Sequence, residues 1–149
     1  MEKLTNLQNI TVQYNCTGIQ WNQISELFEL VGWGYRTPEK IQAAFEKSSH
    51  VIFIKEKDAL IGIGRTVDDG IYYGLIVDVV VHPDKQGLQL GTQIVDYLKS
   101  QMVGYSFITL TAAPGKDGFY EKLGWKKQKS AFLWPKDEQQ QQLHCFNGE

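Results

Sequence analysis

The amino-acid sequence predicts an α+β domain in which helices cover a mixed sheet. Two observations indicate this class. Segments rich in β-branched residues, as expected of strands, lie at 10–14, 50–54, 59–66, 71–81 and 106–111. Apolar residues at helical spacing lie between them, at 21–31, 37–45, 90–102 and 116–123. The order is strand, two helices, three strands, helix, strand, helix and a final strand, which suits an α+β domain.

Length, charge and composition are those of a single globular domain without nucleic-acid or membrane partners. The chain has 149 residues, 42% hydrophobic and 21% charged, with a net charge of −2. No run approaches the about 18 apolar residues of a membrane span, and the first residues lack a signal-peptide core. Cys16 and Cys145 have no metal-ligand spacing, so we expect free thiols, no metal and a cytoplasmic protein.

We place one domain at 1–135 and a polar tail at 136–149. The tail begins Lys-Asp-Glu and continues with four glutamines, a composition that could be disordered. Before it, 125–128 and 130–134 are expected to form a closing hairpin that ends at Pro135.

The first helix and the second have clear boundaries. Gly32 and Gly34 end the first, and Thr37 with Pro38 begins the second as N-cap and first residue. A three-stranded meander follows, with a hairpin-turn signal at 68–70. Its last strand, 71–81, exceeds the usual length of about five or six residues. We therefore expect a bulge or bend that splays this strand from its next neighbour.

The segment 76–98 reads as a strand, a glycine-bearing turn and a helix. Pro83 ends the strand, and Gly87 lies in the turn. The free N–H groups at a helix start, with the helix dipole, make the turn 86–92 a candidate cradle for phosphate or pyrophosphate. A strand-turn-helix unit that binds nothing is the alternative. A P-loop needs Lys followed by Ser or Thr after its last glycine, whereas Thr92 and Gln93 follow Gly91 here. The dinucleotide motif G-x-G-x-x-G begins at Gly62 and Gly64, but Val67 stands where its third glycine should be.

Two motifs carry a resemblance to a known family. The segment 81–91, VHPDKQGLQLG, resembles the acyl-CoA-binding signature V-x-P-x-x-R/Q-G-x-G/A-x-G of the GNAT superfamily of N-acetyltransferases. The segment 119–125, FYEKLGW, resembles that family's FYEKLGF, and the resemblance covers roughly 51–134. It implies a GNAT-like, mostly antiparallel central sheet with a splayed long strand and helices on both faces. Gln86 stands where arginine is commoner, and Gln89 where a small residue is usual.

The resemblance also implies acetyl-CoA as co-substrate and a set of binding residues. The Val79 and Val81 backbones would pair with the pantetheine arm, and the Val79 N–H would polarise the thioester carbonyl. The cofactor-binding residues implied are Val79, Val80, Val81, Gln86, Gly87, Leu88, Gln89, Leu90, Gly91, Thr92 and Tyr120. Tyr120 matches the family's general acid, although a core tyrosine beside Phe119 is the plain alternative.

The general base is not evident. The family's base usually has the strand parity of Leu75 and Val77, where this chain has no titratable group. Asp78 is the candidate base, but alternation sends it to the opposite face unless a bulge intervenes. It could instead be a buried cap or an ion-pair partner of Arg65. A water-relayed base, or no dedicated base, also remains open.

The acceptor site is predicted from aromatic residues, with Trp33, Tyr35 and Tyr73 as candidates. Trp33 and Tyr35 follow the first helix, where this family commonly builds its acceptor wall, although aromatic core packing explains these residues equally well. We expect direct transfer to a small primary amine, because Cys16 and Cys145 have no catalytic setting. A fainter resemblance to plant-type serotonin N-acetyltransferases favours a hydrophobic amine. A protein or peptide N-acetyltransferase and a noncatalytic acyl-CoA-binding module are the alternatives. Homodimers are common in the family, so a homodimer is a further expectation.

Overall fold

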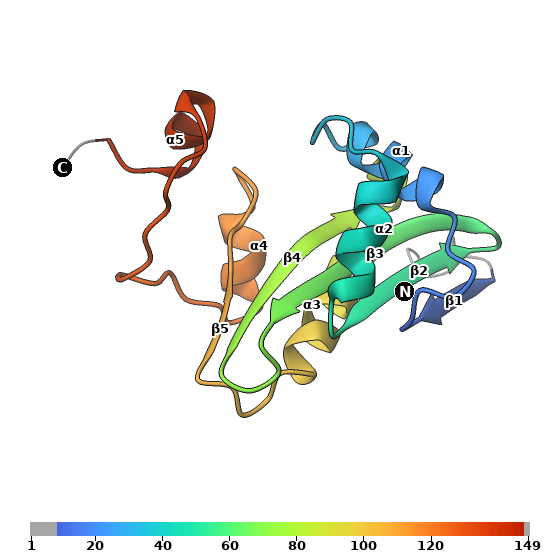
Figure 1. Cartoon of the computed structure of the whole chain (residues 1–149), viewed down its shortest axis with the longest axis horizontal. Helices are drawn as coiled ribbons and strands as arrows, with labels where there is room; N and C mark the ends of the chain where they lie inside the picture. The colour runs from blue at the N-terminus through green and yellow to red at the C-terminus, as the bar shows by residue number, and fades with distance from the viewer. Residues whose placement is uncertain (1–8, 148–149) are drawn as a thin grey trace. The chain divides into compact units, whose positions relative to one another are not determined.

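The computed structural model describes residues 9–147. They form two compact units that divide between Leu110 and Thr111. Among the described residues, the first unit holds a sheet in the order β1-β2-β3-β4-β5 (Figure 1). Its elements are β1 (Ile10–Gln13), α1 (Trp21–Leu30), α2 (Pro38–Lys47), β2 (Val51–Glu56), β3 (Ala59–Asp68), β4 (Tyr73–Val81), a 3-10 helix (Pro83–Lys85), α3 (Leu90–Ser100) and β5 (Phe107–Leu110). Strands β1 to β4 are antiparallel and β5 is parallel to β4, which confirms the predicted fold class.

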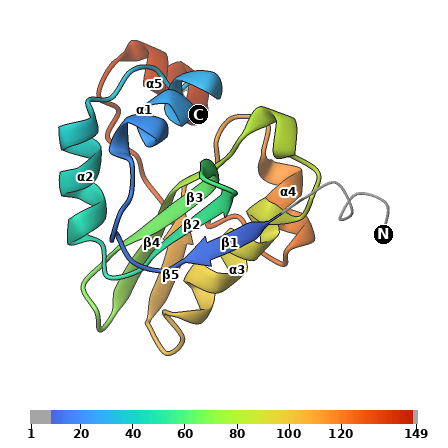
Figure 2. The ribbon, with the colours of Figure 1, turned by 90° about the vertical axis from the view of Figure 1, so that its right-hand side faces the viewer.

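Helices cover both faces of this sheet: α1 and α2 lie on one side and α3 on the other (Figure 2). The core between α1, α2 and the sheet consists of apolar side chains, among them Ile24, Leu27, Phe28, Ile41, Phe45, Val51, Phe53, Ile63 and Val80. The buried residues of α3 are Leu90, Ile94, Val95 and Leu98. The apolar stripes predicted from the sequence are therefore the buried faces of these helices.

Two glycines of β3 let α3 approach the sheet closely. A Cβ on Gly64 would lie 2.5 Å from Ile94 Cγ2 and 3.0 Å from Leu98 Cδ1, and one on Gly62 would lie 3.2 Å from Ile94 Cδ1. These glycines, which resemble the start of a dinucleotide motif, thus serve helix packing. Ile63 and Arg65 alternate with them and so face α1 and α2.

β4 contains the bulge expected from its length. Ile63 pairs with Val80 and Arg65 pairs with Val77, so Gly64 lies opposite both Asp78 and Val79. Asp78 has φ +55°, a left-handed conformation that aspartate tolerates better than most residues. β5 pairs with β4 only from Tyr73 to Ile76. Beyond Ile76, no described strand pairs with the outer edge of β4, which is the predicted splay.

The start of β4 differs from the prediction by two residues. The strand begins at Tyr73, because one carboxylate oxygen of Asp69 accepts hydrogen bonds from the backbone N–H groups of Ile71, Tyr72 and Tyr73 at 2.7–3.1 Å. These hydrogen bonds lower the pKa of Asp69 and extend the turn.

The second unit contains α4 (Asp117–Lys122) and α5 (Glu138–His144). The closing hairpin predicted at 125–134 is wrong: this segment has a turn at Lys129 and Ser130 but no strand. Neither residue favours the positive φ of a two-residue hairpin turn. Part of the tail predicted as polar is helical, because Asp137 accepts a hydrogen bond from the Gln140 N–H at 2.8 Å and caps α5.

Candidate active site

The outer edge of β4 offers unpaired backbone groups. The His82 N–H donates to the Ile61 carbonyl at 2.8 Å, so the next residue back, Val81, points its backbone groups away from β3. The Gln86 side chain confirms this direction, since its Nε2 donates to the Val81 carbonyl at 3.3 Å. Gln86 thus forms a hydrogen bond between the turn and the end of β4.

The turn and the first residues of α3 form a second set of backbone donors. Gly87 has φ +81°, and Gln89, the N-cap of α3, has φ +69°. The N–H groups of Leu90, Gly91 and Thr92 donate no hydrogen bond to any described residue. The first backbone hydrogen bond of the helix is donated by the Gln93 N–H to the Gln89 carbonyl. A helix start of this kind suits an anion such as pyrophosphate.

Two of the predicted cofactor-binding residues serve the core through their side chains. Val80 and Leu90 are 3% and 4% exposed. Only their backbone groups can therefore face a ligand. Val79 and Leu88 are half-buried, whereas Gln86, Gly87 and Gln89 are exposed.

Asp78 lies between two arginines. Its Oδ2 accepts from Arg65 Nε at 2.7 Å and its Oδ1 from Arg36 Nη1 at 3.1 Å. The bulge places Asp78 on the face of Arg65, which is the face of α1 and α2. The ion pair with Arg65 that the sequence allowed is thus present, and the parity that argued against Asp78 as a base no longer holds.

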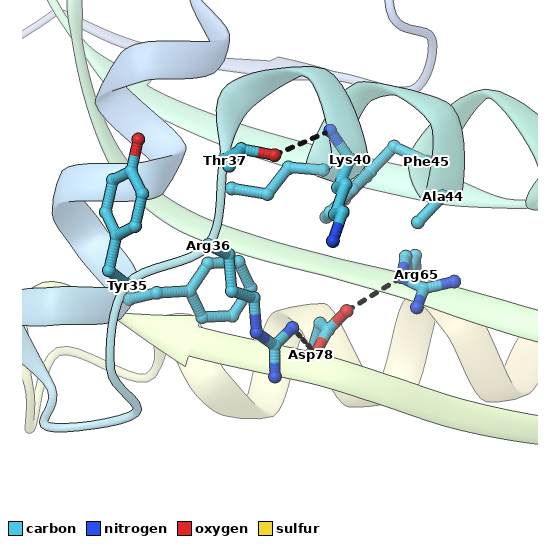
Figure 3. Close-up of a pocket in the computed structure, with 10 residues that line it drawn as sticks. Tyr35, Arg36, Thr37, Lys40, Ala44, Phe45, Arg65 and Asp78 are labelled. Atoms are coloured by element: carbon cyan, nitrogen blue, oxygen red, sulfur yellow. Dashed lines mark hydrogen bonds and ion pairs between the residues drawn. The ribbon is translucent and has the colours of Figure 1, made fainter.

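A pocket of about 300 Å³ opens beside this carboxylate (Figure 3). It lies among α1, the α1–α2 connection, α2, β3 and β4. The lining residues are Phe28, Tyr35, Arg36, Thr37, Lys40, Ile41, Ala44, Phe45, Arg65 and Asp78. Apolar side chains of α1 and α2 form part of the wall, and four charged residues, Arg36, Lys40, Arg65 and Asp78, form much of the rest. A concave site with convergent polar groups is typical of small-molecule binding.

The structure brings one of the three acceptor candidates into the pocket. Tyr35 lines it, whereas Trp33 stacks on Phe28 with ring centroids 5.7 Å apart. Tyr73 lies at the other end of β4, where its ring is parallel to that of Phe107 at 5.7 Å. Sequence reasoning missed Lys40. Its position beside the apolar stripe of α2, one residue before Ile41, was the available signal.

Tyr120 belongs to α4 of the second unit and is partly buried there. Its ring meets those of Phe119 and Trp125 edge to face, with centroids 4.9 and 6.4 Å apart. Burial raises the pKa of Tyr120. The Trp125 indole Nε1 is buried without a hydrogen-bond partner in the described part of the chain.

Other kinds of site find no support in residues 9–147. Within this range, no group of three or more histidine, cysteine or acidic residues is placed to hold a metal. No helix described there has the length and apolar character needed to cross a membrane. Cys16 and Cys145 are free thiols.

Comparison with known proteins shows the family of this chain. Residues 29–133 match the family model of the acetyltransferase (GNAT) domain. An uncharacterised N-acetyltransferase, ycf52, of Pyropia yezoensis is 38% identical over 76% of this chain and 71% of its own length. Rice serotonin N-acetyltransferase 2, named chloroplastic, is 30% identical over 83% of this chain and 65% of its own length. A GNAT-family acetyltransferase structure from Streptococcus pneumoniae has a TM-score of 0.71 at 21% identity, over 87% of this chain and 99% of that one.

The chain belongs to the GNAT family and is an acetyltransferase. The solved structure agrees with the fold.

Proposed function

We propose that this protein transfers acetyl from acetyl-CoA directly to a primary amine on a small molecule. The observation that supports this most is the edge of β4 from Val77 to Val81. On the side away from β3, this edge has no partner strand among the described residues, and the next α-helix along the chain, α3, begins with unpaired N–H groups. Free backbone donors on a strand edge and at a helix start are what an extended, phosphate-bearing acyl carrier requires.

The residues present fit acetyl-CoA. The backbone of Gln86 to Thr92 would hold the pyrophosphate, with Gly87 allowing close approach of the main chain. The outward-facing backbone of Val81, and that of Val79 beside the bulge, would hold the pantetheine arm. When bound, acetyl-CoA supplies an activated thioester.

The chain's own groups would then assist the transfer. The Val79 N–H would donate to the carbonyl oxygen as it gains negative charge. As the new C–N bond forms and the C–S bond breaks, Tyr120 would give a proton to the departing sulfur. Burial favours the protonated form of Tyr120, which suits a proton donor.

The amine proton has two possible routes. Asp78 stays our candidate base, although both of its oxygens already accept from guanidinium groups. A water that relays the proton to solvent is the alternative. Direct transfer is preferred to an acyl-enzyme because Cys16 and Cys145 have no catalytic setting.

The pocket volume of about 300 Å³ supports a small acceptor over a protein segment. The sequence favoured a hydrophobic amine, and the aromatic residues Phe28, Tyr35 and Phe45 in the pocket lining support this. Location in the cytoplasm stays a prediction, and the rice relative is named chloroplastic. The expected homodimer also stays a prediction.

The test is acetyl transfer with a panel of small amines and lysine-bearing peptides. Free CoA thiol and the mass of the acetylated product are both measured. We expect product with small amines and at least a tenfold lower turnover with Tyr120→Phe. Faster transfer to peptides would favour a protein acetyltransferase. Acetyl-CoA binding without any product would instead indicate a noncatalytic module.

A further inference from the structure

The charges around the pocket do not balance. Arg36, Lys40 and Arg65 line it together with one carboxylate, Asp78. Three cations and one anion leave two positive charges. Both Asp78 oxygens are already bound by the two arginines, and Lys40 forms no ion pair with any described residue. Arg36 is 43% exposed and Lys40 is exposed, so both can reach a ligand that enters from solvent. An anionic ligand would offset the excess positive charge.

The two guanidinium groups are held in place before any ligand arrives. Arg36 lies over the Phe28 ring at 4.3 Å and near Trp33 at 5.9 Å, and Arg65 lies over Phe45 at 5.6 Å. Arg65 Nη1 also donates to Ser48 Oγ at 3.3 Å. The Nη2 groups of both arginines make no hydrogen bond with described residues. Fixed guanidinium donors of this kind recognise carboxylate and phosphate groups.

The ion pairs of Asp78 with Arg36 and Arg65 do not account for Lys40. Asp78 accounts for the positions of Arg36 and Arg65, but its carboxylate makes no hydrogen bond or ion pair with Lys40. Figure 3 shows the Lys40 side chain extending from α2 toward the space between the two arginines. Three cationic groups from the α1–α2 connection, α2 and β3 thus converge on one space.

We propose that the amine acceptor carries a second, anionic group, a carboxylate or a phosphate monoester, which Arg36, Lys40 and Arg65 bind. This inference rests on the proposed acetyl transfer and names the substrate class of the same site. It differs from the simple hydrophobic amine that the sequence suggested. The same positive charges favour the neutral form of a nearby amine, which is the form that attacks a thioester.

The experiment compares matched amines that differ by one anionic group. Tryptophan against tryptamine tests the carboxylate, and phosphoethanolamine against ethanolamine tests the phosphate. We measure kcat/KM for each in a buffer without phosphate, for the wild type, Lys40→Gln and Lys47→Gln. Lys47 is the control, since it is exposed in the last turn of the same helix and does not line the pocket.

We expect one anionic member to be preferred over its neutral match, and the preference to fall at least tenfold in Lys40→Gln through a higher KM. Lys47→Gln should keep it. Acetylation with no preference for either anionic amine would overturn the inference and leave the proposed function standing.

A binding measurement separates failure of the inference from failure of the proposed function. If no amine is acetylated, the anion site can still be tested by binding. Tryptophan or phosphoethanolamine should then raise the melting temperature of the wild type and of Lys47→Gln more than that of Lys40→Gln. That outcome would support the anion site while the proposed function fails. No turnover and no such shift would overturn both.

Discussion

Arg65 on β3 and Asp78 on β4 are joined across the β4 bulge, with Nε 2.7 Å from Oδ2. Their side chains are 17% and 10% exposed. Without the bulge, alternation along β4 would turn Asp78 toward α3 with Gly74 and Ile76. The extra residue therefore decides which face of the sheet receives the only acid of the strand.

Asp78→Asn should lower the free energy of unfolding by about 2–4 kcal/mol, because it leaves a partly buried Arg65 without its counter-ion. Asparagine tolerates φ above zero, so the substitution tests the charge and not the backbone. Urea unfolding measures the effect. Asp84→Asn is the control, since that side chain is 85% exposed. Equal stability of the two variants would contradict the assigned role.

Gly64→Ala should destabilise the protein by about 1–3 kcal/mol, because the added methyl would press on Ile94 and Leu98 of α3. Thermal unfolding reports the change. Gly118→Ala is the matched control: nothing lies within 4 Å of a Cβ there, and the residue is in α4. Alanine at 118 should stabilise the helix slightly. A harmless Gly64→Ala would mean that α3 does not pack as closely as described.

Gln89→Gly should stabilise the protein by about 0.5–1 kcal/mol, because glycine adopts φ +69° without the strain of a side chain. The substitution should also tighten acetyl-CoA binding, because it removes the Gln89 side chain from the start of α3, where the pyrophosphate is proposed to bind. Gln89→Ala keeps the strain and should not stabilise. Melting temperatures test the stability and calorimetric dissociation constants test the binding. A similar rise in melting temperature for Gly and Ala would argue against the backbone explanation.

Tyr120 should keep its proton to a higher pH than an exposed tyrosine, whose pKa is about 10, because burial raises its pKa. If Tyr120 is the proposed proton donor, kcat should stay level past the pH at which an exposed tyrosine loses its proton. The same shift contributes stability below the unfolded pKa, which is lost as the pH rises through the folded one. A pH profile of kcat tests this prediction. An alkaline loss centred below pH 9 that persists in Tyr120→Phe would assign the titration to another group.

The sequence predicted the helices and strands whose patterns are local. The apolar stripe of α3 and the Thr37 and Pro38 start of α2 follow directly from residue spacing. The bulge was also expected from the length of its strand. Its position could not be predicted, because it depends on pairing with Gly64, a residue distant in the sequence.

The pocket was beyond local reasoning for a similar reason. A lysine in the first turn of an amphipathic helix normally points to water. Lys40 is itself exposed, and the fold places it on the same pocket as Arg36 and Arg65. At 125–134 the local pattern predicted a hairpin that is absent. Two short segments form a hairpin only when a suitable turn joins them, and this segment lacks one.

The most direct test of the proposed function is a calorimetric titration with acetyl-CoA, using Gly87→Glu as the control. We expect saturable binding to the wild type that the variant loses, because a side chain at φ +81° and a negative charge would both oppose a pyrophosphate in the turn. A circular dichroism melt verifies that the variant is folded. No binding to the wild type would contradict the account of this turn and of the enzyme's co-substrate.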